Sequence, residues 1–459
     1  MCYVTQNLLQ RTRKFPALIL LFLQMLSLAP AQDVTPTIHS RNNVTVSSMA
    51  KYLDATQGKT ADEMVTLALE NNGEIAALRK EAEAAEALIR QARLRPNPTL
   101  EASGTKQIGG ADNSRMVQGA LPLELGGRRA ARIRVAEREL EIRRLAVAER
   151  ERQIAAEVRA KFGEALANIF KLRFAEEMVM LRTEHYNLVA GTVQEGRRPP
   201  LEQNVETVEL NRLRAMRETA DGRTEIALLE LRNLAGIEPP APLRLNGDFE
   251  NLLDFLPPPA EAAQNALGER PDLKGARAIE ALAAARIEQA RSEGRLDAEV
   301  MVGYQRMRSG FPLQGIDDTG NLRMIDSTFN FFTFGVKLNL PVRNRNQGMI
   351  EAAVAEAEAA QRRREFGELT IRREVAVAYT RYQTAARAME IYRVGVREQA
   401  AANLQVVRRT YELGSKPLFD YIAEHHRFIE IENGFIDAQL ETYLARVEIL
   451  RAASLPGLK

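Results

Sequence analysis

The chain has 459 residues, and its 63 basic and 61 acidic residues leave a formal net charge of +2. This near balance lacks the basic excess that nucleic-acid binding requires, so no nucleic-acid partner is predicted. Cys2 is the only cysteine, which excludes an internal disulfide and a zinc site built from cysteine thiolates.

Residues 1–31 are predicted to form a secretory signal peptide. Basic residues precede an apolar stretch at 15–28, and Ala29-Pro30-Ala31 then provides a cleavage motif. A retained signal anchor is the alternative, but the stretch is shorter than the roughly 18–20 residues that span a bilayer. Cleavage before Gln32 removes three basic and no acidic residues, which changes the net charge from +2 to −1. Because no later apolar run is long enough for a transmembrane helix, entry into a membrane would require strands.

After an extended arm at 32–59, the periodicity changes from helical to alternating and back to helical. Thr60 is a capping residue followed by acidic residues, which predicts a helix start. Alternation of apolar residues predicts a strand pair, and a glycine followed by proline predicts a tight turn between helices. The first unit, 60–235, is expected to comprise a helix at 60–94, strands at 99–105 and 116–125, a helix from Arg128 to about 190, a tip near Gly196, and a helix to 234.

The second half of the chain repeats this order. Gln91-Ala92-Arg93 returns as Gln289-Ala290-Arg291, and Gly196-x-x-Pro199 returns as Gly414-x-x-Pro417, so internal duplication is predicted. A proline-rich linker at 236–259 separates the copies. The second unit, 260–455, is expected to comprise a helix, strands at 297–307 and 328–342 around a loop at 309–327, a helix at 347–412, a tip near Gly414, a helix to 453, and a tail at 456–459.

The long helices are predicted to pack laterally. Neither contains proline, and at 1.5 Å per residue each could extend for about 95 Å. Apolar residues recur at alternating spacings of four and three, which is the heptad pattern of supercoiled helices. These residues are Val158, Phe162, Ala165, Ile169 and Leu172 in the first copy, and Ile371, Val375, Ala378, Tyr382, Ala385, Met389, Tyr392 and Val396 in the second.

The four predicted strands cannot close on themselves, because the smallest barrels have about eight strands. Open sheet edges are not tolerated in lipid, so membrane insertion would require several copies of the chain to share one sheet. Ordinary soluble hairpins are the alternative, since alternation is a weak signal for each segment. The chain has no tryptophan, and the candidates for an aromatic girdle are Tyr304, Phe329, Phe331, Phe332 and Phe334.

Three local motifs resemble those of the TolC-type outer-membrane efflux factors. They are L-P-L-E-L-G-G at 121–127, L-P-V-R-N-R-N-Q-G at 340–348 and Y-E-L-G-S-K-P-L-F-D at 411–420. With the duplication, the resemblance covers nearly all of the chain after residue 31. Within this family, the chain looks most similar to the cobalt-zinc-cadmium heavy-metal efflux branch.

The resemblance implies an α+β membrane protein of the outer membrane of a Gram-negative bacterium, with a large periplasmic portion. A homotrimer would form a twelve-stranded β-barrel and an α-helical periplasmic tunnel. The implied partners are a periplasmic adaptor (membrane fusion) protein, a resistance-nodulation-division pump and outer-membrane lipid. The trimer would be a passive conduit rather than an enzyme, without a cofactor, and would carry heavy-metal cations or, alternatively, drugs or organic solutes.

The resemblance also implies candidate pore and docking residues. Asp420 matches an acidic pore constriction, but Ala423 stands where a second acid is common, and Glu424 follows it. The alternative is that Asp420 only stabilises a helix N-terminus. The candidates for adaptor docking, which also have a simple turn-forming interpretation, are Gly196, Arg197, Pro199, Gly414, Lys416 and Pro417.

The histidines do not predict a metal site. Neighbouring His425 and His426 point about 100° apart on a helix, and neither they nor His39 and His185 have a zinc-binding spacing. Two other classes remain as alternatives. A secreted coiled-coil structural or adhesive protein would use the strands as soluble hairpins, and a periplasmic adaptor would have one helical hairpin rather than two.

Overall fold

The computed structural model describes residues 48–249 and 256–458. The predicted signal peptide, His39 and most of the predicted arm lie outside the described residues, as does the middle of the linker. The helices are α1 Ser48–Tyr52, α2 Ala61–Asn71, α3 Gly73–Arg93, α4 Arg128–Gln194, α5 Pro200–Leu234, α6 Pro259–Glu269, α7 Pro271–Glu293, α8 Gln347–Ile391, the π-helical turn η1 Tyr392–Val396, α9 Arg397–Glu412 and α10 Leu418–Ala453. The strands are β1 Thr99–Lys106, β2 Asn113–Pro122, β3 Asp297–Ile316 and β4 Leu322–Asn339.

The prediction of one continuous helix at 60–94 was wrong, because the chain breaks at Asn72. The Asn72 side chain accepts hydrogen bonds from the backbone of Glu74 and Ile75, so it caps α3 and ends α2. The second copy breaks 198 residues later, at Arg270, because the next residue, Pro271, has no N–H to continue a helix. As a result α2 and α6 have the same length, 11 residues.

The described end of the predicted arm is not simply extended. It contains the short helix α1, and its following residues pair with the linker between the repeats. The backbone N–H of Leu245 donates to Tyr52 O at 2.9 Å, and Leu53 and Lys59 each form a parallel bridge with Leu245. The end of the arm therefore holds the start of the first repeat against the linker between the two copies.

The strands form one antiparallel sheet in the order β1-β2-β3-β4. The prediction of a loop at 309–327 was wrong, because β3 and β4 remain paired beyond a bulge between Gly310 and Gln314. Asp317 then forms the turn by accepting backbone hydrogen bonds from Thr319 and Asn321. The lack of a clear alternation in this stretch hid the strands, since pairing of backbone groups does not require it.

The two faces of the sheet differ in polarity and in exposure. Cross-strand pairing puts Leu100, Gly119, Val302 and Phe334 in one row, and Leu121, Val300 and Val336 in the next. These apolar side chains are exposed, with Phe334 at 77% and Val336 at 61%. The opposite face carries Glu101, Gln118 and Thr333 in one row. We call the first of these faces the apolar face.

The predicted aromatic girdle divides between the two faces. Tyr304 and Phe332 are cross-strand partners on the apolar face, with ring centroids 5.2 Å apart. Phe329 and Phe331 have the opposite parity to Phe332 along β4 and therefore lie on the polar face, 6.3 Å apart. Only Tyr304, Phe332 and Phe334 of the five predicted residues share the apolar face.

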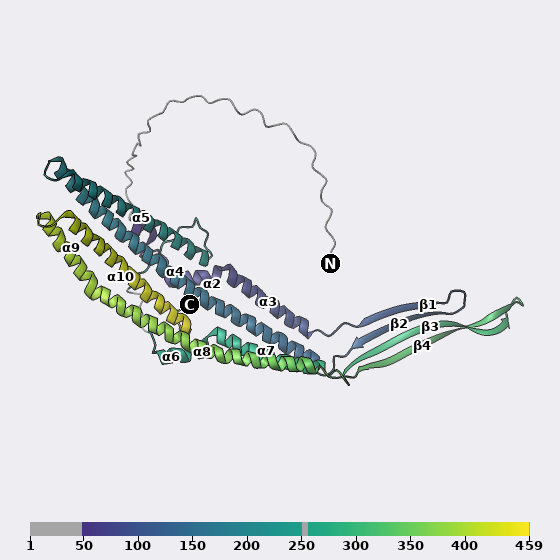
Figure 1. The fold of residues 1–459 in the computed structure, drawn as a ribbon. Helices are drawn as coiled ribbons and strands as arrows, with labels where there is room; N and C mark the ends of the chain where they lie inside the picture. The colour runs from purple at the N-terminus through teal and green to yellow at the C-terminus, as the bar shows by residue number, and fades with distance from the viewer. Residues whose placement is uncertain (1–47, 250–255, 459) are drawn as a thin grey trace, which may run out of the picture. The chain divides into compact units, whose positions relative to one another are not determined.

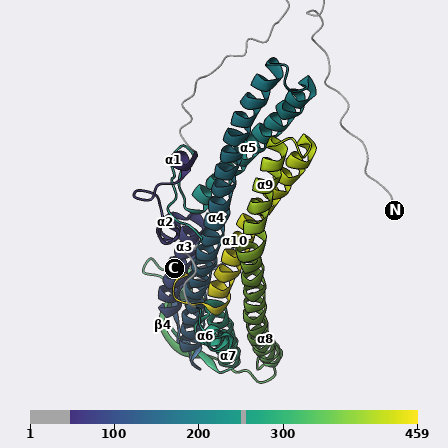
Figure 2. The ribbon, with the colours of Figure 1, turned by 90° about the vertical axis from the view of Figure 1, so that its left-hand side faces the viewer.

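Each copy forms a long antiparallel helical hairpin. The first pairs α4, of 67 residues, with α5, and the second pairs α8, η1 and α9 with α10. The predicted single helix at 347–412 is thus interrupted by η1, a π-helical turn. The two tips lie at the opposite end of the helices from the strands (Figure 1), and Figure 2 shows the hairpins side by side. Among the described residues, no helix is both long enough and apolar enough to span a bilayer.

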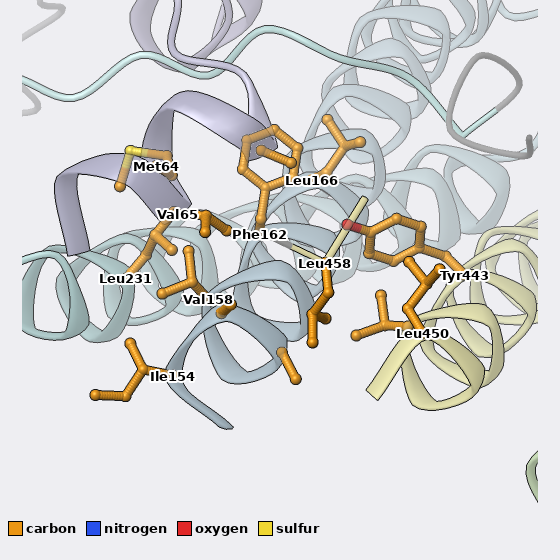
Figure 3. Close-up of a cluster of buried hydrophobic side chains, with 14 of the residues drawn as sticks. Met64, Val65, Ile154, Val158, Phe162, Leu166, Leu231, Tyr443, Leu450 and Leu458 are labelled. Carbon is orange, nitrogen blue, oxygen red and sulfur yellow. The ribbon is translucent and has the colours of Figure 1, made fainter. Parts of the chain in front are cut away.

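The largest core joins both repeats near the middle of α4 and the C-terminal ends of α5 and α10. The predicted heptad residues of the first copy, Val158 to Leu172, are fully buried in it. Figure 3 shows Phe162 among residues of α2, α5 and α10, including Met64, Leu231 and Tyr443. Leu458, at the end of the described chain, is also buried here at 3% exposure.

Gly163→Ala is expected to destabilise the fold, because the Tyr443 ring of α10 packs directly against this residue of α4. A Cβ at Gly163 would lie 2.4 Å from Tyr443 Cδ1, so the buried ring must move. The expected overpacking cost is about 1–3 kcal/mol. Gly222→Ala in α5 is the matched control, since nothing lies within 4 Å of its Cβ. The melting temperature, measured by circular dichroism, should fall for Gly163→Ala and stay level or rise for Gly222→Ala. Equal melting temperatures would contradict this packing.

Candidate functional site at the hairpin tips

The two hairpin tips have the same backbone construction. Gly196 and Gly414 adopt φ angles of +70° and +75°, which favour glycine. At each tip the glycine N–H donates to the carbonyl three residues earlier. The N–H of the following residue donates to the carbonyl five residues earlier, which is Thr192 O in the first tip and Thr410 O in the second. This is the Schellman closure of a helix. Pro199 and Pro417 then precede α5 and α10 as capping residues.

The six predicted docking residues all lie on exposed surface at these turns. Arg197 pairs with Glu195 in the first tip, and Lys416 pairs with Asp420 in the second. Large apolar side chains beside them are also exposed, namely Leu201 at 63%, Leu413 at 80% and Phe419 at 65%. Each tip therefore combines charged and apolar groups on a rigid turn.

A polar contact joins the two hairpins just behind the tips. Arg198, from the first tip, pairs with Glu202 at 2.9 Å and lies over the ring of Tyr411 from α9 at 4.9 Å. The Tyr411 hydroxyl donates to Glu202 at 3.2 Å. Burial raises the pKa of Tyr411 to about 12, so the phenol stays protonated and continues to donate.

A second, buried network lies deeper between the hairpins, and sequence reasoning missed it. Arg182 of α4 and Glu206 of α5 form an ion pair at 3.2 Å, with side chains 1% and 0% exposed. His185 Nδ1 lies 3.3 Å from the same carboxylate. Burial opposes ionisation of Glu206, but His185 and Arg182 outweigh it and hold its pKa below the ordinary value.

Aromatic rings of the second hairpin cover this buried pair. The Arg182 guanidinium lies 5.3 Å from the centre of the Tyr421 ring. Tyr421 stacks on Tyr411 with an interplanar angle of 4°. His425 is buried, and burial lowers its pKa to about 3, so it packs as a neutral ring. Its neighbour His426 instead contacts Glu209 at 2.7 Å. The network therefore links α4, α5, α9 and α10.

The sequence did carry a signal for this network. Ala175, Met178, Arg182, His185 and Val189 are spaced 3-4-3-4, so Arg182 and His185 occupy positions of a buried seam. Charged residues at seam positions must be paired, because an isolated buried charge is costly.

The two predicted pore residues differ in their surroundings. Asp420 lies in the first turn of α10, and its side chain is 46% exposed and 3.2 Å from Lys416. Glu424 lies one turn later, is only 14% exposed and pairs with Arg427 at 3.1 Å. The geometry of a single chain therefore leaves Asp420 the more accessible of the two carboxylates. Across residues 48–249 and 256–458, no group of three His, Cys, Asp or Glu side chains is arranged to hold a metal ion.

Comparisons with known proteins match both repeats. The family model for outer membrane efflux proteins matches residues 64–237 and 262–455. The cobalt-zinc-cadmium resistance protein CzcC of Cupriavidus metallidurans is 25% identical over 85% of this chain and 89% of its own length. The nickel-cobalt-cadmium resistance protein NccC of Alcaligenes xylosoxydans xylosoxydans is 28% identical over 53% of this chain and 50% of its own length.

Solved structures show the same fold. CusC, from a study of transmembrane channel formation, aligns with a TM-score of 0.71 at 17% identity, covering 86% of this chain and 91% of that one. The outer-membrane channel OprN aligns with a TM-score of 0.69 at 17% identity, covering 90% and 96%. The predicted family, fold class and outer-membrane location are confirmed, as is the role of a channel rather than an enzyme. The chain belongs to the outer membrane efflux protein family.

Proposed function

We propose that three copies of this chain form the outer-membrane conduit of a tripartite efflux system that exports heavy-metal cations. The observation that carries the proposal is the family match across both repeats, combined with relatives named for resistance to cobalt, zinc, cadmium and nickel. This match favours a channel over a secreted coiled-coil protein or a periplasmic adaptor. Drugs or organic solutes are the alternative cargo.

The sheet supports assembly with other copies. Its outer strands, β1 and β4, each have one edge without a partner strand among the described residues. Three copies would join β4 of one chain to β1 of the next and close a twelve-stranded barrel, which leaves no edge in lipid. The exposed apolar face would contact lipid, and the polar face would line the aqueous conduit.

The exposed tips support docking of a periplasmic adaptor, which would connect the conduit to a resistance-nodulation-division pump in the inner membrane. Gly196, Arg197 and Pro199 lie at one tip, and the turn containing Gly414, Lys416 and Pro417 lies at the other. Rigid turns that present both charged and apolar groups suit a protein partner. The pump would supply both the energy and the choice of cargo.

Deletion of the gene tests the proposed cargo. Survival should fall on cobalt, zinc and cadmium, and cell-associated metal should rise, while drug susceptibility stays the same. Complementation with the intact chain should restore both measurements. Sensitisation to drugs alone would replace the metal assignment by the alternative, whereas a detergent-solubilised protein without pores in planar bilayers would contradict the conduit itself.

Asp420→Asn is expected to reduce cation preference in planar bilayers. A unit charge about 4 Å from a passing ion is worth about 1 kcal/mol even in bulk water, or about a fivefold change in relative permeability. Glu430→Gln, another exposed acid on α10, is the control. Glu424→Gln should have a smaller effect, because Glu424 is largely covered and paired with Arg427. Unchanged reversal potentials in Asp420→Asn would refute a selectivity role for this residue.

A further inference from the structure

A cavity lies where β4 ends and α8 begins, at the boundary between the sheet and the helices. Its volume is about 530 Å³, which is enough for a small headgroup. The residues that line it include two guanidinium groups, Arg295 and Arg343, together with the amides of Asn344 and Asn346. The loop concerned, 340–346, carries one of the family-like motifs, and the channel function alone does not account for its arginines.

The wall of the cavity is fixed to the end of α7. Asn346 adopts a φ angle of +63°, and its side-chain amide donates to Ala290 O at 2.9 Å. Its backbone N–H donates to the Asn344 side chain at 3.0 Å. Gly294 packs directly on the loop, since a Cβ there would lie 2.2 Å from Arg345 O. The cavity is therefore a built feature rather than a gap beside a free loop.

The charge in and around the cavity is positive. Among the described residues, the exposed Arg343 and Arg345 side chains have no carboxylate partner. Arg295 donates through Nη1 to Gly126 O at 3.0 Å, which leaves further N–H groups available. Glu293 supplies one carboxylate to the lining. By contrast, the nearby Arg128 is already neutralised by Asp297 at 2.6 Å.

Exposed apolar side chains lead directly into the cavity. Leu340 and Val342 line it and are 62% and 71% exposed. They follow the end of β4 across a tight turn in which the Val342 N–H donates to Leu340 O at 2.9 Å, and they lie next in the chain to Val336 and Leu338 of the apolar face, which are 61% and 53% exposed. An occupant would thus meet guanidinium and amide groups at one end and a hydrocarbon-compatible surface at the other.

We propose that this cavity binds the phosphate headgroup of a phospholipid from the leaflet of the outer membrane nearest the helices. The guanidinium groups match phosphate oxygens in charge and geometry, and an acyl chain lies along Leu340 and Val342. The inference rests on the proposed placement of the apolar face in lipid. It adds to the channel a site that fixes the depth of the sheet in the membrane.

Native mass spectrometry of the detergent-solubilised wild-type assembly, titrated with phosphatidylglycerol, tests the site. Arg343→Gln should weaken lipid binding by about tenfold, the worth of one charge-assisted contact. Arg343→Lys should give an intermediate loss, because it keeps the charge without the planar fork. The control is Arg372→Gln, which removes an exposed arginine from α8 about 38 Å along the helix from its start.

A parallel titration with inorganic phosphate separates the two sources of the ligand. Weak phosphate binding supports a lipid site, whereas phosphate that binds as tightly as the lipid overturns it in favour of a free anion. Equal lipid binding by wild type and Arg343→Gln also overturns it. Pore formation by the same samples keeps the outcomes distinct, because a conducting Arg343→Gln assembly with unchanged lipid binding refutes only the headgroup site.

Discussion

Glu206→Gln is expected to destabilise the tip half of the hairpins by about 3–5 kcal/mol, the cost of removing one partner of a buried ion pair. The substitution preserves the size of the side chain but leaves the Arg182 guanidinium, 1% exposed, without its anion. Hydrogen exchange should therefore accelerate in the tip-proximal parts of α4 and α5. The melting temperature should also fall.

Glu218→Gln is the matched control on the same helix. Glu218 pairs with Arg217 at the surface and is 68% exposed, so its loss should cost close to nothing. Equal exchange rates in the two variants would show that the Arg182–Glu206 pair does not hold α4 and α5 together.

The same substitution should change the response to acid. The pKa of Glu206 is lowered in the folded chain, so its contribution is present above the ordinary pKa of glutamate and is lost as the pH falls through the lowered value. In the wild type, protection of the tip-proximal parts of α4 and α5 from hydrogen exchange should be lost over this acidic range. Glu206→Gln should not show this pH-dependent loss of protection, because an amide does not titrate.

Phe162→Ala is expected to cost about 3–5 kcal/mol, the range for removing a buried aromatic ring. Phe162 is fully buried where α4 meets α2, α5 and α10, and a Cβ on Gly247 of the linker would lie 3.4 Å from its ring. Loss of the ring therefore weakens contacts between both repeats at once. The melting temperature, measured by circular dichroism, should fall, and so should the yield of assembled protein.

Phe419→Ala provides the comparison for this variant. Phe419 is 65% exposed at the second tip, so its removal leaves the core intact and should preserve melting. Equal melting temperatures for Phe162→Ala and Phe419→Ala would contradict the central role of this core. Loss of adaptor binding in Phe419→Ala alone would be consistent with the proposed docking surface.

The regular parts of the fold could be predicted because their sequence periods are long and uninterrupted. The first heptad seam, Val158 to Leu172, is buried as expected, and the predicted apolar alternation of the strands identifies one face of the sheet. The break at Asn72 was missed although asparagine favours helix caps and Asn-Gly marks turns, and the capping hydrogen bonds of Asn72 define the boundary. The extension of β3 and β4 was missed because its residues lack alternation.

The candidate site was predicted less completely than the fold. Glycine and proline marked both tips, since turn chemistry is local. The buried Arg182–Glu206 pair joins residues on two helices and requires knowledge of how the helices face each other. Asp420 illustrates the same limit, because its proposed role depends on copies of the chain that surround it.

The unequal strands set a level for the surrounding lipid. Beyond Arg308, β3 runs past the end of β2, so within the described chain one of its edges has backbone groups with no neighbouring strand. Such an edge is tolerated in water but not in hydrocarbon. The shortest strand, β1, has 8 residues, a length of about 26 Å at 3.3 Å per residue. In the proposed assembly, hydrocarbon would surround only this shorter stretch, and the β3–β4 ribbon would project beyond it as a water-exposed rim.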